Sequence, residues 1–236
     1  MGTFLRNLAL WIFALISVPL FGTVAILISP FSRPLAHKVA WLWCRLVLLI
    51  SGVRLEVKGG EHLEPGKRYV FFANHQSQMD IPVLEEALRA FEIRFLAKRS
   101  LFKIPFFGWG IWAIGYIPVE REDPREGVKS LLACVERIRE GFSVVVFPEG
   151  TRSPDGRLLP FKTAGFLLPI RSRVPAVPVA LRGTRKILPR GSLYLHPGKV
   201  EVLVGPPLPT EGLGPRDRER LAREVRKFLE KALEGP

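Results

Sequence analysis

An uncharged apolar segment near the start of the chain limits what this sequence can fold into. Residues 8–28 contain no charged side chain, and as a helix they would extend about 30 Å, the thickness of the hydrocarbon core of a bilayer. From residue 1 to residue 53 the only charged side chains are basic: Arg6, Arg33, Lys38 and Arg45. The sequence therefore predicts that residues 1–52 attach the protein to a membrane.

The apolar segment contains Pro19, and a second apolar stretch, residues 35–51, follows Pro34. We interpret the two stretches as a kinked helix pair that enters one leaflet and leaves its basic residues near anionic headgroups. A transmembrane hairpin and a buried helix pair of a soluble protein are the alternatives. A cleaved signal peptide fits poorly, because the apolar run is too long and lacks a small-residue cleavage site. The basic bias predicts that the rest of the chain lies on the cytoplasmic face of the inner membrane.

From residue 53 onward, short apolar runs alternate with helical patterns. The runs that predict strands are 53–58, 68–73, 93–97, 115–119, 143–147, 176–181 and 200–204, and the predicted helices are 81–90, 124–140 and 215–233. Several strands are continuously apolar, as expected for strands covered on both faces. Residues 53–236 are therefore predicted to form an α/β domain, with a mixed, largely parallel sheet flanked by helices.

The composition excludes several functional classes. The formal net charge of +13 suits anionic partners, but no nucleic-acid-binding motif accompanies it, and a nucleic-acid-binding protein would not need the apolar N-terminus. Two cysteines, Cys44 and Cys134, make no disulfide framework and are expected to be core thiols. His37, His62 and His196 lie in contexts without metal-ligand spacing, so no metal is expected, and no other cofactor is predicted.

Amide side chains are scarce except in one short segment. The chain has two Asn and two Gln, and three of these four residues lie within residues 74–78. Few amides together with 21 Pro is a pattern typical of thermophiles. The cluster of amides lies in residues 74–80, NHQSQMD, which directly follow the predicted strand YVFFA. The carboxyl end of a strand is where α/β sheets place their functional residues.

His75 and Asp80 form the chemical candidate in this segment. A carboxylate that accepts from one imidazole nitrogen fixes the tautomer and stabilises the imidazolium formed when the other nitrogen takes a proton. The alternative is structural, because Asp80 precedes a helical pattern and could cap it. No G-x-S-x-G segment supplies a serine nucleophile, although Ser77 is a minor candidate.

Residues 74–80 resemble the N-H-x-x-x-x-D block of the glycerolipid acyltransferases. Three further blocks of that family have similar counterparts here in the same order: GYIPVER at 115–121, FPEGTRS at 147–153 and VPAVPVA at 174–180. Residues 97–109 also resemble the family, although Ser100 replaces a commonly acidic position. Four ordered blocks across residues 60–205 are far more specific than one.

The resemblance implies acyl transfer from acyl-ACP (ACP, acyl carrier protein) or acyl-CoA to the sn-2 hydroxyl of 1-acylglycerol 3-phosphate (lysophosphatidic acid), forming phosphatidic acid in phospholipid biosynthesis. His75 would act as general base, with Asp80 orienting it. Asn74 is the candidate for stabilising the oxyanion. The substrate-binding positions implied are Lys98, Arg121, Glu149, Gly150, Thr151 and Arg152.

Several points stay open at this stage. The acceptor could instead be glycerol 3-phosphate or another lysophospholipid, and a basic membrane scaffold is the non-enzymatic alternative. Glu149 could form a structural ion pair. Residues 102–112 could line an acyl-chain tunnel or pack as core. The basic run at 182–199 could meet anionic lipid, coenzyme A, an acidic carrier protein, or only solvent. The acyl donor, chain length, mode of membrane insertion and oligomeric state are not predicted.

Overall fold

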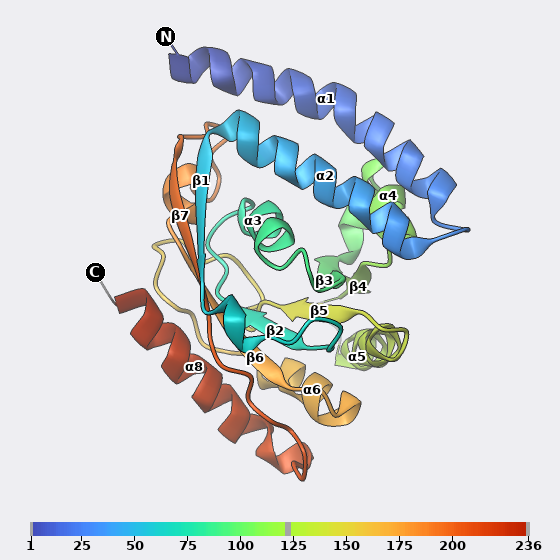
Figure 1. Ribbon diagram of the computed structural model, residues 1–236, viewed down its shortest axis with the longest axis vertical. Coiled ribbons are helices and arrows are strands. Elements are labelled where there is room, and N and C mark those ends of the chain that lie inside the picture. The colour runs from blue at the N-terminus through green and yellow to red at the C-terminus, as the bar shows by residue number, and fades with distance from the viewer. Residues whose placement is uncertain (1, 121–123, 235–236) are drawn as a thin grey trace.

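A twisted sheet runs through the centre of the molecule, with helices on both of its faces (Figure 1). The computed structural model describes residues 2–120 and 124–234. Within them seven strands lie in the order β1-β7-β6-β2-β5-β3-β4, and every neighbouring pair is parallel except β6–β7. The strands are β1 (Val53–Lys58), β2 (Val70–Ala73), β3 (Ile93–Lys98), β4 (Ile117–Val119), β5 (Ser143–Val146), β6 (Ala176–Arg182) and β7 (Gly198–Val204). The predicted α/β fold with a mixed, largely parallel sheet is confirmed.

The helices include two long N-terminal ones and one long C-terminal one. In chain order they are α1 (Gly2–Ile28), α2 (Arg33–Ser51), α3 (Asp80–Ala87), α4 (Phe107–Ala113), α5 (Pro124–Arg139), α6 (Leu167–Ser172), α7 (Thr184–Ile187) and α8 (Arg218–Glu234). The sequence analysis found the longer helices but not α4, α6 and α7. Each of these three has fewer than eight residues, too few for an apolar face to repeat.

The position of β2 inside the sheet explains why its sequence is continuously apolar. Successive side chains of a strand point to opposite faces. Phe71 and Ala73 join the hydrophobic cluster beneath α2 and α3, whereas Val70 and Phe72 join the cluster beneath α5, α6 and α8. All four residues are 0% exposed. Helices therefore cover the strand on both faces, and its polar chemistry is confined to its carboxyl end.

The helix pair α1–α2 covers one end of the molecule. Ser32 accepts a hydrogen bond from the Leu35 amide at the start of α2, and Gly52, with φ of 71°, ends it. The helix α2 packs between α1 and α3, and α1 continues through Pro19 as a single helix. Both helices are long and apolar enough to cross a membrane, although only 11% of the most apolar window of α1 is buried.

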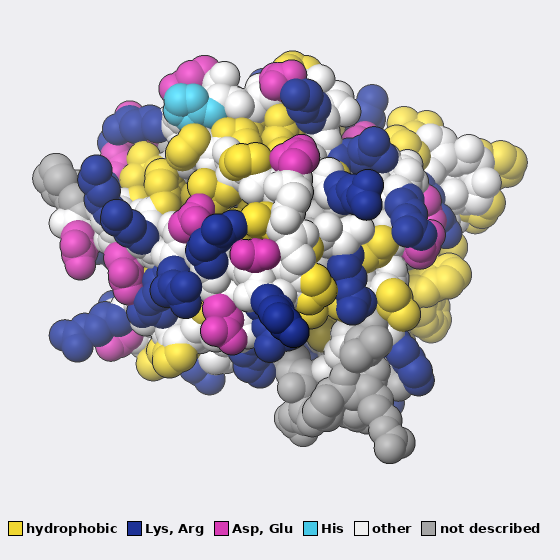
Figure 2. Space-filling view, turned by 90° about the horizontal axis from the view of Figure 1, so that it is seen from below, with side chains coloured by type: hydrophobic (Ala, Val, Ile, Leu, Met, Phe, Trp, Pro, Cys, Tyr) yellow, Lys and Arg dark blue, Asp and Glu magenta, His cyan; other side chains and the backbone are white. Residues whose placement is uncertain are grey.

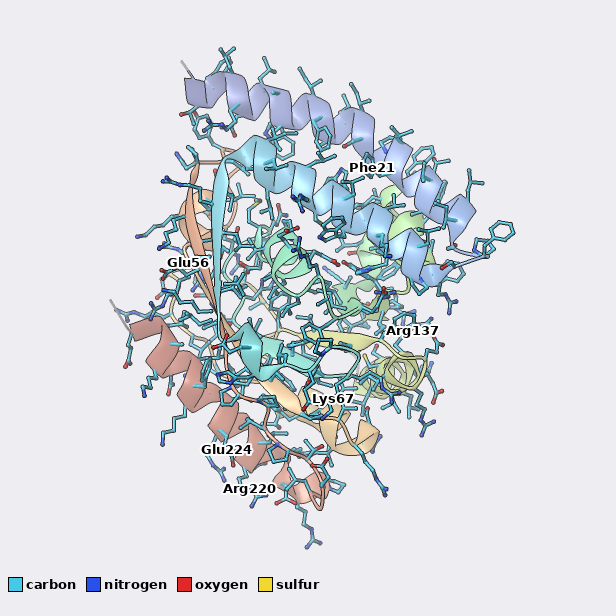
Figure 3. All side chains as sticks on the ribbon, in the orientation of Figure 1. Phe21, Glu56, Lys67, Arg137, Arg220 and Glu224 are labelled. Atoms are coloured by element: carbon cyan, nitrogen blue, oxygen red, sulfur yellow. The ribbon has the colours of Figure 1, made fainter. Side chains whose placement is uncertain are left out.

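The opposite end of the molecule is covered by α8, which has a different surface. Its buried residues Leu221, Val225 and Leu229 face the sheet. Arg220 and Glu224 point away from the fold on the side remote from α1 (Figure 3). Figure 2 shows this remote face, where Lys and Arg side chains are interspersed with Asp and Glu.

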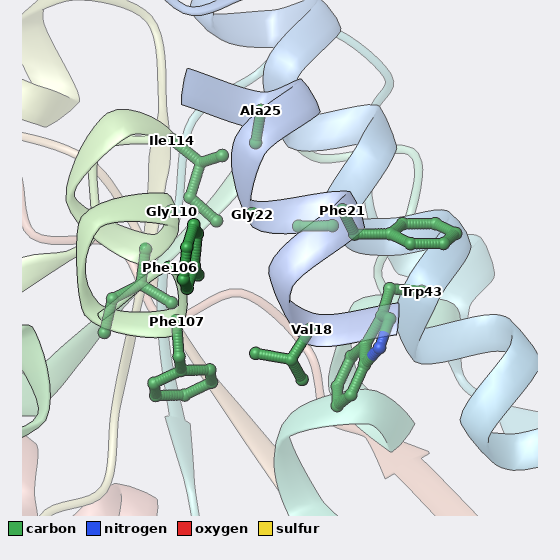
Figure 4. A pocket seen from close by; sticks show the side chains of 11 residues that line it. Val18, Phe21, Gly22, Ala25, Trp43, Phe106, Phe107, Gly110 and Ile114 are labelled. Atoms are coloured by element: carbon green, nitrogen blue, oxygen red, sulfur yellow. The ribbon is translucent and has the colours of Figure 1, made fainter. Parts of the chain in front are cut away.

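The aromatic segment that includes α4 packs against α1. A cavity of about 70 Å³ lies between α1, α2 and α4, lined almost entirely by apolar groups (Figure 4). At its wall a Cβ atom on Gly22 would lie 2.5 Å from the carbonyl oxygen of Phe106, so this close approach requires glycine. The segment thus packs beside the helix pair, and its role in binding an acyl chain stays a prediction.

Candidate active site

The candidate residues gather at one edge of the sheet. Strands β6, β2, β5, β3 and β4 are consecutive and parallel, so their carboxyl ends meet at the same edge. The block at residues 74–80 follows β2, the block at 147–153 follows β5, and Lys98 ends β3. Segments up to 74 residues apart therefore converge where parallel sheets bind their ligands.

His75 and Asp80 face each other at hydrogen-bond distance. The imidazole Nδ1 lies 2.7 Å from Asp80 Oδ2. The Asp80 side chain is 0% exposed, whereas 13% of the His75 side chain remains accessible. Because the Asp80 oxygen accepts, Nδ1 carries the proton, and Nε2 is left with its lone pair. This is the arrangement that a histidine general base requires.

Asp80 also shapes the loop that carries His75. Its Oδ2 accepts hydrogen bonds from the backbone amides of Gln76 at 2.7 Å and Ser77 at 2.9 Å. Both donors precede Asp80, and α3 begins at Asp80 itself with Met79 at the N-cap position. The alternative in which Asp80 caps the following helix is therefore wrong, and its carboxylate closes the loop before the helix instead.

The Glu149 carboxylate is buried and accepts a hydrogen bond from the backbone of His75, and it does not lie at an exposed position. Its Oε1 accepts from the His75 amide at 2.7 Å, and its Oε2 accepts from the Leu159 amide at 2.8 Å. The His75 carbonyl accepts from the Ser153 amide at 2.8 Å. Burial raises the pKa of Glu149, and the two amide hydrogen bonds oppose that rise. Direct contact of Glu149 with substrate stays a prediction.

Phe147 is a site residue that the sequence analysis did not single out. Its ring stacks on the His75 imidazole, with centroids 4.0 Å apart and planes inclined by 16°. The contact fixes the plane of the imidazole, which the single hydrogen bond to Asp80 would not do. The FPEGTRS block begins with this residue, but nothing in a local pattern tells which ring a phenylalanine will stack against.

The side chains of Asn74 and Ser77 hydrogen-bond to backbone groups of the fold. The Asn74 amide donates to the Leu181 carbonyl at 3.0 Å, and its Oδ1 accepts from the Leu181 amide at 2.7 Å, which ties β2 to β6. Any oxyanion role of Asn74 rests on the second N–H of its amide and stays a prediction. The Ser77 hydroxyl donates to the Leu188 carbonyl at 2.7 Å and accepts from the Met79 amide. Such a buried, doubly bonded hydroxyl is poorly placed to act as a nucleophile.

The predicted substrate-binding residues that the structure describes are more exposed than the His75 loop, except for Glu149, which is buried. Lys98 and Thr151 are exposed and Arg152 is partly exposed at the same edge of the sheet. Gly150 has a φ of 69°, which lets the chain turn back after β5. Arg121 lies outside the described residues.

Two of the other histidines, His37 and His196, have neighbours that account for them. His37 Nε2 lies 3.1 Å from a buried carboxylate oxygen of Glu85, and the ring of His196 packs edge-on against Tyr194. Among residues 2–120 and 124–234, no group of three or more His, Cys, Asp or Glu side chains is placed to hold a metal ion. The expectation that no metal or other cofactor is needed stays a prediction.

The sequence has relatives among known proteins. A family model described as Acyltransferase matches residues 54–182, which include the four blocks noted above. A chloroplastic 1-acyl-sn-glycerol-3-phosphate acyltransferase of Brassica napus is 37% identical over 185 residues, or 78% of this chain and 53% of that protein. The 1-acyl-sn-glycerol-3-phosphate acyltransferase of Pseudomonas aeruginosa is 28% identical over 236 residues, or 97% of this chain and 90% of that protein.

A solved structure is also similar. The crystal structure of the 1-acyl-sn-glycerophosphate (LPA) acyltransferase PlsC from Thermotoga maritima superposes with a TM-score of 0.80 at 27% identity, and the match covers 98% of this chain and 96% of that one. The present chain spans about half the length of the plant relative but nearly all of both bacterial proteins. The similarity to the bacterial proteins therefore includes the N-terminal helix pair.

Proposed function

The chain belongs to the acyltransferase family, and on that premise we propose that it transfers an acyl group from a thioester to the sn-2 hydroxyl of 1-acylglycerol 3-phosphate, forming phosphatidic acid. The names of its relatives support the acceptor. One observation carries the chemistry: Asp80 holds Nδ1 of His75 at 2.7 Å, which leaves Nε2 to accept a proton at a partly exposed position.

The proposed reaction is a single displacement. Nε2 of His75 takes the proton of the acceptor hydroxyl as that oxygen attacks the thioester carbonyl carbon. The tetrahedral intermediate collapses with cleavage of the C–S bond, and the imidazolium returns its proton to the leaving thiolate. Asp80 stabilises the imidazolium between these steps. Glu149 and Phe147 act as positioning residues, since they hold the backbone and the ring of His75.

The acceptor phosphate needs fixed positive charge close to His75. Arg152 is the strongest candidate, because it follows Gly150 in the block whose backbone bonds to His75, and guanidinium matches phosphate geometry. Lys98, at the end of β3, and Arg121 are the further candidates. The proposal includes that these basic side chains become ordered when the acceptor phosphate binds.

We further propose that the protein works at the cytoplasmic face of the inner membrane, with α1 lying in one leaflet. The outward side of α1 is almost entirely apolar, and its most exposed residues include Leu15 at 78% and Leu27 at 66%. The other side of α1 packs on α2 and α4. A helix fixed along the protein in this way suits insertion into one leaflet better than a crossing of both.

The test follows thiol release by the purified full-length chain in detergent. Oleoyl-lysophosphatidate, glycerol 3-phosphate and lysophosphatidylcholine are each offered with the same acyl-CoA, then with the same acyl-ACP, and the His75→Ala variant is the blank. We expect release that depends on lysophosphatidate and disappears in the variant. The two donor series identify the thioester carrier.

Other outcomes point to the alternatives. Preference for glycerol 3-phosphate or lysophosphatidylcholine would replace the proposed acceptor but keep the reaction. Release without any acceptor would indicate a thioesterase. Membrane binding with no release from either donor, unchanged by His75→Ala, would favour the membrane scaffold.

A further inference from the structure

The segment of residues 188–197, here called the 188–197 loop, lies between α7 and β7. At its start the Leu188 carbonyl accepts from the Ser77 hydroxyl at 2.7 Å, so the loop touches the segment that carries His75. Arg190 donates to the Arg152 carbonyl at 2.9 Å. The remainder of the loop lies beside the N-terminal half of α1 (Figure 1). The loop thus connects the catalytic edge of the sheet with the apolar helix.

Two side chains of α1 hold the backbone of this loop. Asn7 donates to the Leu195 carbonyl at 2.8 Å and accepts from the Leu195 amide at 2.7 Å. Trp11 Nε1 donates to the Leu193 carbonyl at 3.0 Å. Asn7 is 5% exposed and is the one Asn or Gln side chain of α1. Burying an amide side chain is costly unless it is hydrogen-bonded. The two bonds to Leu195 satisfy the Asn7 amide and attach the loop to α1.

The bonds to α1 fix which side chains of the loop face outward. Leu195 is buried against the core at 3% exposure, while Leu193 is 71% exposed and Tyr194 is 40% exposed. Leu193 lies beside Trp11, which is itself 43% exposed. On α1, Leu8 and Leu15 lie three residues before and four after Trp11, on the same exposed face. The apolar surface of α1 therefore continues onto the loop.

The loop and the residues just before it are basic. Residues 183–200 contain no Asp or Glu. Arg185, Lys186 and Arg190 are exposed, and within the part of the chain that the structure describes they form no ion pair with a carboxylate. Arg185 and Arg190 instead donate to backbone carbonyls. An exposed leucine and tyrosine bordered by such cations match the boundary between acyl chains and anionic headgroups.

We propose that the 188–197 loop is a second membrane-contact element, with Leu193 and Tyr194 in the interface beside Trp11 and with Arg185, Lys186 and Arg190 against anionic phospholipid headgroups. The inference rests on the proposed membrane attachment through α1 and adds a separate surface to it. Because the loop is bonded to Ser77, its contact with the bilayer sets the height of His75 near the headgroups, where a lysophospholipid presents its hydroxyl.

The experiment places one fluorophore at a time on the full-length protein. The native Cys44 and Cys134 are buried, and burial raises the pKa of Cys134 to about 12, so a thiol-reactive dye goes to an introduced cysteine. The tested site is Leu193→Cys and the positive control is Leu15→Cys. The negative control is Glu224→Cys, on α8 at the far end of the molecule (Figure 3). Each protein is reconstituted in phosphatidylcholine–phosphatidylglycerol vesicles with or without nitroxide-labelled phospholipid.

We expect the nitroxide to quench the dye at positions 15 and 193 and to leave position 224 unquenched. Quenching at 15 without quenching at 193 would overturn the second contact while preserving attachment through α1. The absence of quenching at both positions would overturn both.

A charge variant tests the headgroup part separately. We expect Arg185→Gln with Lys186→Gln to reduce quenching at position 193 in anionic vesicles and to leave it unchanged in vesicles of phosphatidylcholine alone. Equal quenching of the charge variant and its parent in anionic vesicles would overturn the electrostatic contribution.

Discussion

Two regions of the active-site edge differ in how firmly their side chains are held. In the segment 74–80, the side chains of Asn74, Ser77 and Asp80 are buried, and each is hydrogen-bonded to backbone groups. In the predicted substrate-binding region, Lys98 and Thr151 are exposed and Arg152 is partly exposed. The first region is organised before any ligand arrives, whereas the second can adapt to one.

This difference matches the two tasks of a transferase. A general base must be held at a fixed position, since small displacements from the reacting hydroxyl cost large factors in rate. A doubly charged phosphate is attracted from a distance and tolerates cations on flexible chains. Substitutions in the first region should therefore change kcat, and substitutions in the second should change KM.

Among substitutions of the residues around His75, the largest effect is expected from Asp80→Asn. The amide oxygen can still accept hydrogen bonds, but the negative charge that stabilises the His75 imidazolium is lost, so kcat should fall about 10³-fold. Thiol-release kinetics measure this effect. The unfolding midpoint, recorded in parallel, tells a catalytic loss from unfolding, and a kcat within about tenfold of the native value would contradict the role given to Asp80.

Arg152→Ala should act mainly on acceptor binding. Loss of a charge-assisted hydrogen bond to phosphate costs about 1.5–3 kcal/mol, which corresponds to an increase in KM for lysophosphatidate of about 10- to 150-fold with little change in kcat. Arg157→Ala is the matched control, because that side chain is almost fully exposed, and it should change KM less than about threefold. Equal effects of the two variants would remove Arg152 from the phosphate site.

Glu149→Gln should give a smaller effect that depends on pH. Burial raises the pKa of Glu149 above its ordinary value of 4.5, so folding favours the protonated carboxyl. Its contribution to stability is therefore fully present below 4.5 and is lost as the pH rises through the raised pKa. The difference in unfolding free energy between the native protein and the variant should follow this course in denaturant titrations. A difference that grows with pH would contradict the assignment.

Local sequence patterns were sufficient to predict the strands but not the side-chain contacts between the segments that follow them. The seven strands and the pairing of His75 with Asp80 could be predicted, because apolar runs and a five-residue spacing are local properties. The bond from the His75 amide to Glu149 spans 74 residues, and the bridge from Asn74 to Leu181 spans 107. Such partners are chosen by strand order, which no local pattern encodes. For this reason the backbone bonds of Glu149 and Asn74 were not predicted, while contact of either residue with the ligand stays a prediction.

The central claim is that Nε2 of His75 takes the acceptor proton and that no acyl-enzyme forms. The most direct test compares lysophosphatidate-dependent thiol release by the native protein, His75→Ala and Ser77→Ala under the same conditions. The account predicts that His75→Ala loses about 10²- to 10⁴-fold in rate, while Ser77→Ala stays within about tenfold of the native protein. Full activity of His75→Ala, or loss in Ser77→Ala together with an acyl group trapped on Ser77 of the native chain, would contradict it.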